Sequence, residues 1–202
     1  RSRGEIAGFD TGPGNALLDA IVRVATGGRE AYDAGGERAL AGRPDAEAVA
    51  RFLERPYFGA APPKSTGKEL FGPEAAAELA GLVHPGREMA DLGDRELRDL
   101  LATAARVTAE SVRRGAELVP EVTEVVVSGG GLRNKAVMQE LSELFKPRPV
   151  FGLSRLGLDP DAKEAVGFAL LASETLAGRP GNVPAATGAG RPVVLGKICP
   201  AL

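Results

Sequence analysis

Apolar residues recur at helical spacing in three parts of the chain. The longest such stretch runs from Asp94 to Val119, and its apolar positions are Leu97, Leu100, Leu101, Ala104, Val107, Val112 and Leu118. This spacing predicts one long helix, ended by Pro120, whose apolar face lies in a core or a dimer contact. A shorter helix is expected after Asn15, which is its predicted N-cap, and the pair Gly27-Gly28 ends it.

A third helix is predicted from about Asp161 to Ala177, with Gly178 beyond its end. Its inward-facing residues are expected to be Ala165, Phe168, Ala169, Ala172 and Leu176. Between Tyr32 and Pro73 the chain is interrupted often by glycine and proline, which predicts loops and a short helix over 44–54.

Short β-branched runs predict the strands. The run "EVVVS" (Glu124–Ser128) is nearly uncharged, as expected of a central parallel strand buried on both faces. Three glycines then lead into a helix around 133–145, and "RPVFG" follows as another strand, which makes a strand–helix–strand unit. Residues 4–9 and the late run "PVVLGKI" are also expected to be strands. The sequence therefore predicts an α/β fold.

Composition narrows the class of protein. The chain has 202 residues, of which 44% are hydrophobic and 26% charged, so one large or two small globular domains are expected. The net charge is −2 and the basic residues are scattered, so the sequence shows no basic patch that would bind nucleic acid or an anionic membrane. The lone Cys199 and the lack of a signal-like or membrane-spanning run favour a cytoplasmic setting. The single histidine, His84, is too little for a histidine metal cluster or a Ser–His–Asp triad.

Two glycine-rich turns each stand between an apolar run and a helix: "GFDTGPGN" at 8–15 and "VVVSGGGLRN" at 125–134. Both place free N–H groups and a helix N-terminus where an anion could bind, although glycines also serve tight turns and close packing. Asn134 stands where the dinucleotide fingerprint needs a further glycine, so a Rossmann dehydrogenase is disfavoured. Pro63 replaces the second glycine of a Walker-like run, "GAAPPKS", and removes a backbone donor there.

Five motifs, taken together in chain order, carry a resemblance. They are "GFDTGPGN", "PKSTGKE", "SGGGLRN", "DAKEAVGFALLASETLAGRPGNVPAATGA" and "RPVVLGKI", and they extend from Gly8 to Ile198. In this order they resemble anhydro-N-acetylmuramic acid kinases of the hexokinase and actin-like ATPase superfamily. The resemblance implies a ribonuclease-H-like lobe with a mixed sheet flanked by helices. It also implies ATP and Mg²⁺ as cofactors, and an anhydro amino sugar of peptidoglycan recycling as substrate.

The resemblance covers the C-terminal lobe of a two-lobed enzyme. The phosphate loop Gly-Thr-Ser-x-Asp-Gly of the N-terminal lobe is absent from this sequence. Residues 1–202 are thus expected to be one lobe, made of a catalytic loop (8–28), a loop-rich and short-helix segment (29–92) and a nucleotide-binding α/β part (93–202). Its expected partners are the N-terminal lobe and a second copy in a homodimer. A nucleotide-binding module and an actin-like assembly protein are the alternatives.

Candidate site residues follow from the same matches. Asp10 falls on the family's catalytic acid, although aspartate is also common in turns. The substrate-binding candidates are Gly12, Gly14, Asn15, Lys64, Ser65, Thr66 and Glu164. The nucleotide-binding candidates are Gly129, Gly130, Gly131 and Asn134. For Glu164 a first helical turn, and for Lys64 a solvated loop, offer purely structural explanations. No metal-ligand spacing is present, so no residue is assigned to Mg²⁺.

Overall fold

The long helix predicted from the leucine spacing forms the centre of the fold. In the computed structural model, which describes residues 6–119 and 121–199, helix α7 spans Asp94–Ala116. Twelve of its 23 residues are buried, so its apolar face lies in the core and is not a dimer contact. The helix starts where the Gly93 N–H donates to the Glu96 carboxylate over 2.8 Å. Its end, at Ala116, comes three residues before the predicted one, and Pro120 lies outside the described residues.

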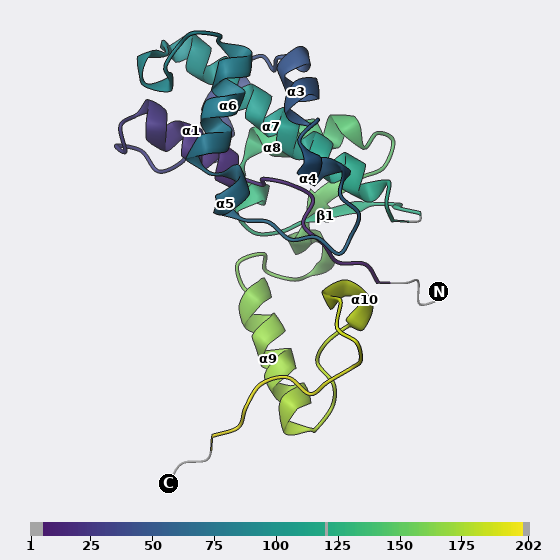
Figure 1. Cartoon of the computed structure of the whole chain (residues 1–202). Helices are drawn as coiled ribbons and strands as arrows, with labels where there is room; N and C mark the ends of the chain where they lie inside the picture. The colour runs from purple at the N-terminus through teal and green to yellow at the C-terminus, as the bar shows by residue number, and fades with distance from the viewer. Residues whose placement is uncertain (1–5, 120, 200–202) are drawn as a thin grey trace.

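The shorter helices of this body are, along the chain, α1 (Ala16–Ala25), α2 (Glu37–Ala41), α3 (Ala46–Phe52), α4 (Pro56–Gly59), α5 (Lys68–Phe71), α6 (Pro73–Val83) and α8 (Lys135–Leu144). Of these, α1, α2, α3, α6 and α8 pack against α7 (Figure 1). Short 3₁₀ turns lie between them: η1 (Ala34–Gly36), η2 (Met89–Asp91) and η3 (Gly130–Arg133). The largest side chains that are fully buried include Phe52, Phe71, Phe145, Leu17, Ile21, Leu79 and Leu100.

Three of the predicted helices in this body are confirmed. Helix α1 begins after Asn15 and ends before Gly27 and Gly28, whose φ angles of 61° and 80° are left-handed. Helix α3 lies within the predicted 44–54, and α8 within 133–145. Helix α6 is an 11-residue element in a segment that the sequence predicted to be loop-rich, because its alanine-rich apolar face was not recognised.

The predicted strand–helix–strand unit is also confirmed. Strand β1 (Val125–Val127) runs parallel to β2 (Val150–Gly152), with Val126 opposite Phe151, and α8 connects them. Both strands are only half-buried, so the prediction of a strand buried on both faces is wrong for β1. The described residues form no further strand, and β1 therefore has a single neighbour. The fold is α/β with many helices and a small parallel sheet.

Two predicted strands are not formed. Residues 6–9, the described part of the first, and the run "PVVLGKI" near the end are irregular. The late run makes an isolated backbone hydrogen bond instead of a ladder, from Gly181 N to Val193 O over 3.1 Å. A β-rich sequence needs a neighbouring strand with free backbone groups, and the described chain offers none beside these segments.

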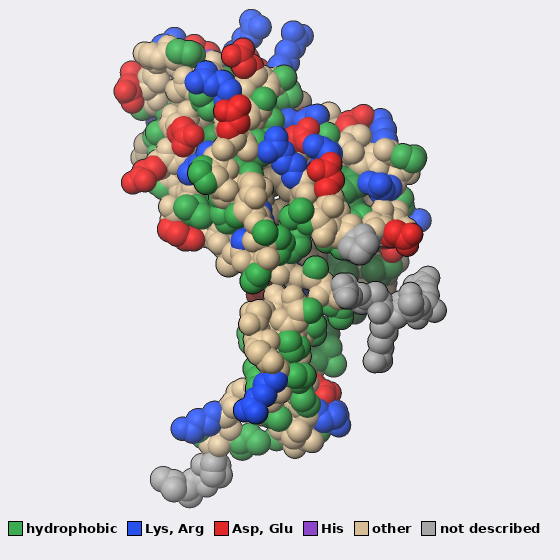
Figure 2. All heavy atoms as spheres, turned by 45° about the vertical axis from the view of Figure 1, so that its right-hand side comes forward, with side chains coloured by type: hydrophobic (Ala, Val, Ile, Leu, Met, Phe, Trp, Pro, Cys, Tyr) green, Lys and Arg blue, Asp and Glu red, His purple; other side chains and the backbone are tan. Residues whose placement is uncertain are grey.

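The predicted third helix is present, but its surroundings differ from the prediction. After β2 come η4 (Leu153–Leu156), α9 (Lys163–Leu176) and α10 (Pro184–Thr187), which project from the helical body (Figure 1). No residue of α9 is buried, so its expected inward face is wrong: Phe168 is 73% and Leu176 75% exposed. Figure 2 shows hydrophobic side chains on the surface of this projecting part. Among the described helices, none is both long and apolar enough to span a membrane.

The central position of α7 predicts how the chain responds to truncation of its core. Leu100→Ala should lower the free energy of unfolding by about 2–5 kcal/mol, because Leu100 is fully buried and its removal leaves a cavity. The matched control Leu118→Ala, at a leucine that is 53% exposed, should change stability by less than about 0.5 kcal/mol. Circular dichroism during urea unfolding measures the free energy of unfolding of both variants. An equal loss of stability in the two would contradict the central role of α7.

Candidate functional site

The carboxylate of Asp10 is held by the segment that carries three of the other predicted residues. Asp10 Oδ2 accepts a hydrogen bond from Ser65 Oγ over 3.0 Å and one from the Thr66 N–H over 2.9 Å. The Asp10 N–H donates to the Lys64 carbonyl oxygen over 3.0 Å. Asp10 thus joins two segments that lie more than 50 residues apart in the sequence, a contact that the sequence analysis did not predict.

A tyrosine that the sequence analysis did not single out completes this arrangement. The Tyr57 hydroxyl donates to the Asp10 carbonyl oxygen over 2.8 Å. Burial, and then the negative charge of Asp10, raise the pKa of Tyr57, so its hydroxyl stays a donor. Nothing in the sequence pattern identified Tyr57, because its contact depends on how α4 is placed against the Asp10 loop.

The side chains around Asp10 leave polar groups available to a ligand. Asp10 itself is exposed, and within the described chain its second carboxylate oxygen accepts no hydrogen bond. The Thr66 hydroxyl oxygen is buried and has no partner among the described residues. A buried hydroxyl without a partner is costly, so a ligand bound here would satisfy it. The arrangement can hold a polar molecule and accept a proton from it at Asp10.

The ammonium group of Lys64 is turned toward the protein. Lys64 Nζ donates to the Tyr57 carbonyl oxygen over 3.1 Å and lies 4.9 Å from the centre of the Tyr57 ring. Burial lowers the pKa of Lys64. These contacts fix the loop that carries Ser65 and Thr66, so Lys64 supports the position of its neighbours.

The two predicted glycines after Asp10 fasten their loop to α7. A Cβ added at Gly12 would lie 2.4 Å from Ser111 Oγ, so only glycine allows this approach. Gly14 has a φ of 55°, and its carbonyl oxygen accepts from Thr108 Oγ1 over 2.9 Å. These contacts set the direction in which the loop enters α1.

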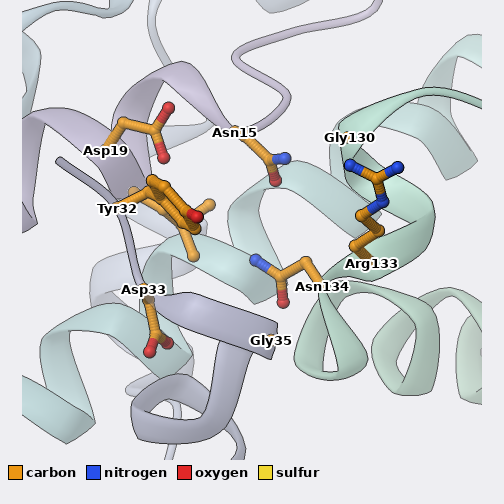
Figure 3. A pocket seen from close by; sticks show the side chains of 9 residues that line it. Asn15, Asp19, Tyr32, Asp33, Gly35, Gly130, Arg133 and Asn134 are labelled. Carbon is orange, nitrogen blue, oxygen red and sulfur yellow. The ribbon is translucent and has the colours of Figure 1, made fainter. Parts of the chain in front are cut away.

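The predicted nucleotide-binding loop and Asn15 border the same pocket (Figure 3). The pocket has a volume of about 350 Å³ and is lined by Asn15, Leu18, Asp19, Tyr32, Asp33, Gly35, Gly130, Arg133 and Asn134. We call it the Asn15 pocket. Asn15 occupies the N-cap position of α1 as predicted, but its side chain makes no capping hydrogen bond. Its side-chain oxygen is buried without a partner in the described chain, which again marks a place for a ligand.

The glycine loop opposite Asn15 leaves open space. Gly129 has a φ of 73°, and a Cβ added at Gly129 or Gly131 would meet no atom within 4 Å. Gly130 faces Asn15, since its added Cβ would lie 3.4 Å from Asn15 Nδ2. Asn134 Oδ1 accepts from the Val137 N–H over 3.1 Å and so caps α8. The backbone of Gly129–Gly131 therefore carries no side chain on the pocket side. A flat ring or a phosphate could lie directly against it.

Two further residues of the Asn15 pocket were missed by the sequence analysis. Asp19 lies one helical turn after Asn15 on α1, a spacing that could have identified it. Burial raises the pKa of Asp19, with Arg23 and Lys68 acting in the opposite direction. Tyr32 adds an aromatic side chain that is 61% exposed. By contrast, Asp33 accepts hydrogen bonds from the N–H groups of Arg38 and Ala39 and thereby holds the start of α2.

Glu164 lies neither among the residues around Asp10 nor in the Asn15 pocket. It lies exposed in the first turn of α9, and no hydrogen bond or ion pair joins it to another described residue. Arg133 forms an ion pair with Asp161, which links η3 to the segment just before α9. Across residues 6–119 and 121–199, no three histidine, cysteine, aspartate or glutamate side chains lie close enough to hold a metal ion.

Comparisons with known proteins extend over nearly the whole chain. The family model for anhydro-N-acetylmuramic acid kinase matches residues 2–201. A curated kinase of that name from Streptomyces coelicolor is 45% identical over 193 residues, which cover 95% of this chain and 46% of the relative. The relative from a Cyanothece strain is 43% identical and that from Xanthomonas axonopodis pv. citri 41%, covering 96% and 98% of this chain and 50% of each relative.

The chain spans about half the length of the curated relatives that it matches. The matched residues nevertheless include the Asp10 loop, the glycine loop and α9, since the family model covers residues 2–201. The chain therefore belongs to the anhydro-N-acetylmuramic acid kinase family.

Proposed function

We propose that this chain is the catalytic and nucleotide-binding part of an ATP-dependent kinase that acts on anhydro-N-acetylmuramic acid. The reaction opens the 1,6-anhydro ring with water and transfers the γ-phosphoryl group of ATP to O6. Its products are N-acetylmuramic acid 6-phosphate and ADP, and its role is in peptidoglycan recycling in the cytoplasm. The observation that carries the proposal is the junction of Asp10 with Ser65 and Thr66 in a chain of this family.

Asp10 acts as the general base. Ser65 and Thr66 donate to one carboxylate oxygen and fix its orientation, while the other oxygen accepts a proton from the attacking water. The water oxygen then bonds to the anomeric carbon, the bond from that carbon to O6 breaks, and O6 takes the phosphoryl group. The unpartnered Thr66 hydroxyl supports a sugar hydroxyl bound beside Asp10.

The Asn15 pocket is the proposed nucleotide site. Bound there, ATP would supply the phosphoryl group, with Mg²⁺ neutralising charge on its phosphates. The bare backbone of Gly129–Gly131 would lie against the adenosine, and the Asn15 amide would satisfy its free oxygen on the ligand. Asn134 helps by fixing η3 against α8. No described residue is assigned to the metal.

The fold supports a place in a larger enzyme. The β1–α8–β2 unit and the helices around it fit one ribonuclease-H-like lobe of a sugar kinase, extending over residues 1–202. The second lobe, which would carry the phosphate loop, corresponds to the part of the relatives that this chain does not span. Turnover is then a property of both lobes together.

The first test removes the proposed base. Asp10→Asn keeps the shape of the side chain but cannot accept the proton, so turnover by the two-lobed enzyme should fall by about 10²–10⁴-fold. Phosphorylated sugar is measured by mass spectrometry and ADP by a coupled assay. Asp91→Asn, at an exposed carboxylate on η2, is the matched control and should keep full activity. Unchanged turnover in Asp10→Asn would instead favour a nucleotide-binding module without this chemistry.

The second test concerns the nucleotide. Gly130→Gln places a side chain in the Asn15 pocket, and we expect ATP to bind at least about tenfold more weakly, a difference of about 1.4 kcal/mol. Gly81→Gln is the matched control, because a Cβ at Gly81 also meets no atom within 4 Å but lies on α6, outside the pocket. Calorimetric titration with ATP measures the dissociation constant of each variant. Equal affinities would place the nucleotide elsewhere.

A further inference from the structure

Both backbone groups of Asp10 are hydrogen-bonded, although the segment that leads to it is irregular. The Asp10 N–H donates to the Lys64 carbonyl oxygen over 3.0 Å, and the Asp10 carbonyl oxygen accepts from the Tyr57 hydroxyl over 2.8 Å. Within residues 6–12, no other backbone N–H pairs with a backbone oxygen of the described chain. The direction of the Asp10 backbone therefore depends on these two bonds and on the contact of Gly12 with α7, and not on a strand ladder.

The two residues that hold the Asp10 backbone are also joined to each other. Lys64 Nζ donates to the Tyr57 carbonyl oxygen over 3.1 Å and lies 4.9 Å from the centre of the Tyr57 ring. Asp10, Tyr57 and Lys64 thus form a closed cycle, with one hydrogen bond between each pair of residues. We call this cycle the Asp10 clamp. Three segments that are joined in pairs resist sliding past one another, whereas the loss of one bond leaves two of them free to move apart.

Aromatic packing fixes the position of Tyr57. Its ring meets the Phe71 ring edge to face, with the centroids 5.5 Å apart, and the Phe58 ring in the same way at 5.9 Å. Phe58 and Phe71 are both buried in the core. Because packed aromatic side chains keep one rotamer, the Tyr57 hydroxyl is directed at the Asp10 loop before any ligand binds.

The ammonium group of Lys64 is committed to the protein. Besides the Tyr57 carbonyl oxygen, the Phe58 carbonyl oxygen accepts from Lys64 Nζ over 3.5 Å. Burial lowers the pKa of Lys64, and the contact with the Tyr57 ring offsets part of the cost of holding a positive charge there. The sequence analysis placed Lys64 among the substrate-binding candidates, but these contacts favour a role through Asp10.

The Asp10 clamp also determines where the carboxylate of Asp10 lies. Ser65 and Thr66 follow Lys64 directly and donate to Asp10 Oδ2 over 3.0 and 2.9 Å. Residues 64–66 therefore hold both the backbone and the side chain of Asp10, and a shift of these residues relative to Tyr57 would turn the carboxylate. The other carboxylate oxygen accepts no hydrogen bond within the described chain, so its direction follows from the rest of the residue.

We propose that Tyr57 and Lys64 are positioning residues for the general base: they hold the backbone of Asp10 and thereby direct its unpaired carboxylate oxygen at the attacking water. This rests on the proposed function, in which Asp10 takes a proton from that water. Neither residue touches the reacting atoms. Both act on the rate because a reacting group that is misplaced by about 1 Å can lose about 10²-fold in rate.

The kinetic test compares Tyr57→Phe with Asp10→Asn in the two-lobed enzyme. Tyr57→Phe removes one hydroxyl and keeps the ring, so we expect kcat to fall about 10- to 100-fold while KM for ATP and for the sugar stays within about twofold. In an enzyme that already carries Asp10→Asn, Tyr57→Phe should lower kcat by less than about twofold, because Tyr57 acts only through that carboxylate. Lys64→Met removes the ammonium group, keeps an unbranched side chain and should behave like Tyr57→Phe.

The matched control is Ser142→Ala on α8. It also removes a hydroxyl that donates to a backbone oxygen, that of Met138 over 2.7 Å, and it should keep the full kcat. An unchanged kcat in Tyr57→Phe, or a further large loss when Tyr57→Phe is added to Asp10→Asn, would overturn the proposal. A raised KM with an unchanged kcat in Lys64→Met would overturn it for Lys64 and return that residue to the substrate-binding group.

A second measurement needs no turnover and separates this inference from the proposed function. In the whole 202-residue chain, NMR follows hydrogen–deuterium exchange at the Asp10 N–H, which is slow only while the Asp10 clamp holds. We expect Tyr57→Phe to speed this exchange about fivefold, as the loss of one hydrogen bond predicts, and Ser142→Ala to leave it unchanged. Equal exchange in all three chains would overturn the Asp10 clamp. Full turnover in Asp10→Asn would instead overturn the proposed function, and faster exchange in Tyr57→Phe would then leave the clamp in place.

Discussion

The burial of α7 is the constraint on which the rest of the structure depends. A helix of 23 residues with twelve buried positions can exist only if other helices cover it on several sides. Its small residues, such as Ala104, Ala105 and Ala109, allow those helices to approach closely. Because packed interiors tolerate little displacement, every segment in contact with α7 has a fixed position.

The proposed site inherits its geometry from this contact. Gly12 lies directly against Ser111, and the Gly14 carbonyl oxygen is hydrogen-bonded to Thr108, both of which belong to α7. The loop from Asp10 to Asn15 is therefore fastened at its middle. One end of the loop places the Asp10 carboxylate within hydrogen-bonding distance of Ser65 and Thr66. The other end places Asn15 opposite the glycine loop. A reactive group on a loop can be positioned well when the loop itself is held by a rigid helix.

The sequence predicted the parts of this fold that depend on local pattern. Periodic leucine and alanine identified α7 and α1, because this pattern reflects burial within the chain itself. The β-branched run identified β1, although that strand is only half-buried. The order of the shared motifs likewise placed Asp10, Ser65 and Thr66 among the candidate site residues, but the hydrogen bonds between them were not predicted. Tyr57 was not predictable, since no pattern encodes its contact with a backbone oxygen 47 residues away.

The orientation of α9 was predicted wrongly for a different reason. An apolar pattern shows that a side chain must be buried, but not which polypeptide buries it. The same reasoning applies to the runs predicted as strands at 6–9 and 192–198, whose β-branched and apolar residues find no neighbouring strand in the described chain. These failures all fall outside the helical body, in segments that begin or follow it.

Asp10 is exposed, and this exposure limits how strongly its charge can act. In water, the charge of Asp10 and its hydrogen bonds to Ser65 and Thr66 are screened by a high dielectric, and a phosphoryl group would be open to hydrolysis. Helix α10 lies beside the segment that leads to Asp10, since a Cβ added at Gly8 would lie 2.9 Å from Ala186 Cβ. The hydrogen bonds from Ser65 Oγ and the Thr66 N–H nevertheless hold one carboxylate oxygen in a fixed direction, and the contacts of Gly12 and Gly14 with α7 keep the loop in place. The orientation of Asp10 is therefore set within this chain, by α7 and by residues 65–66.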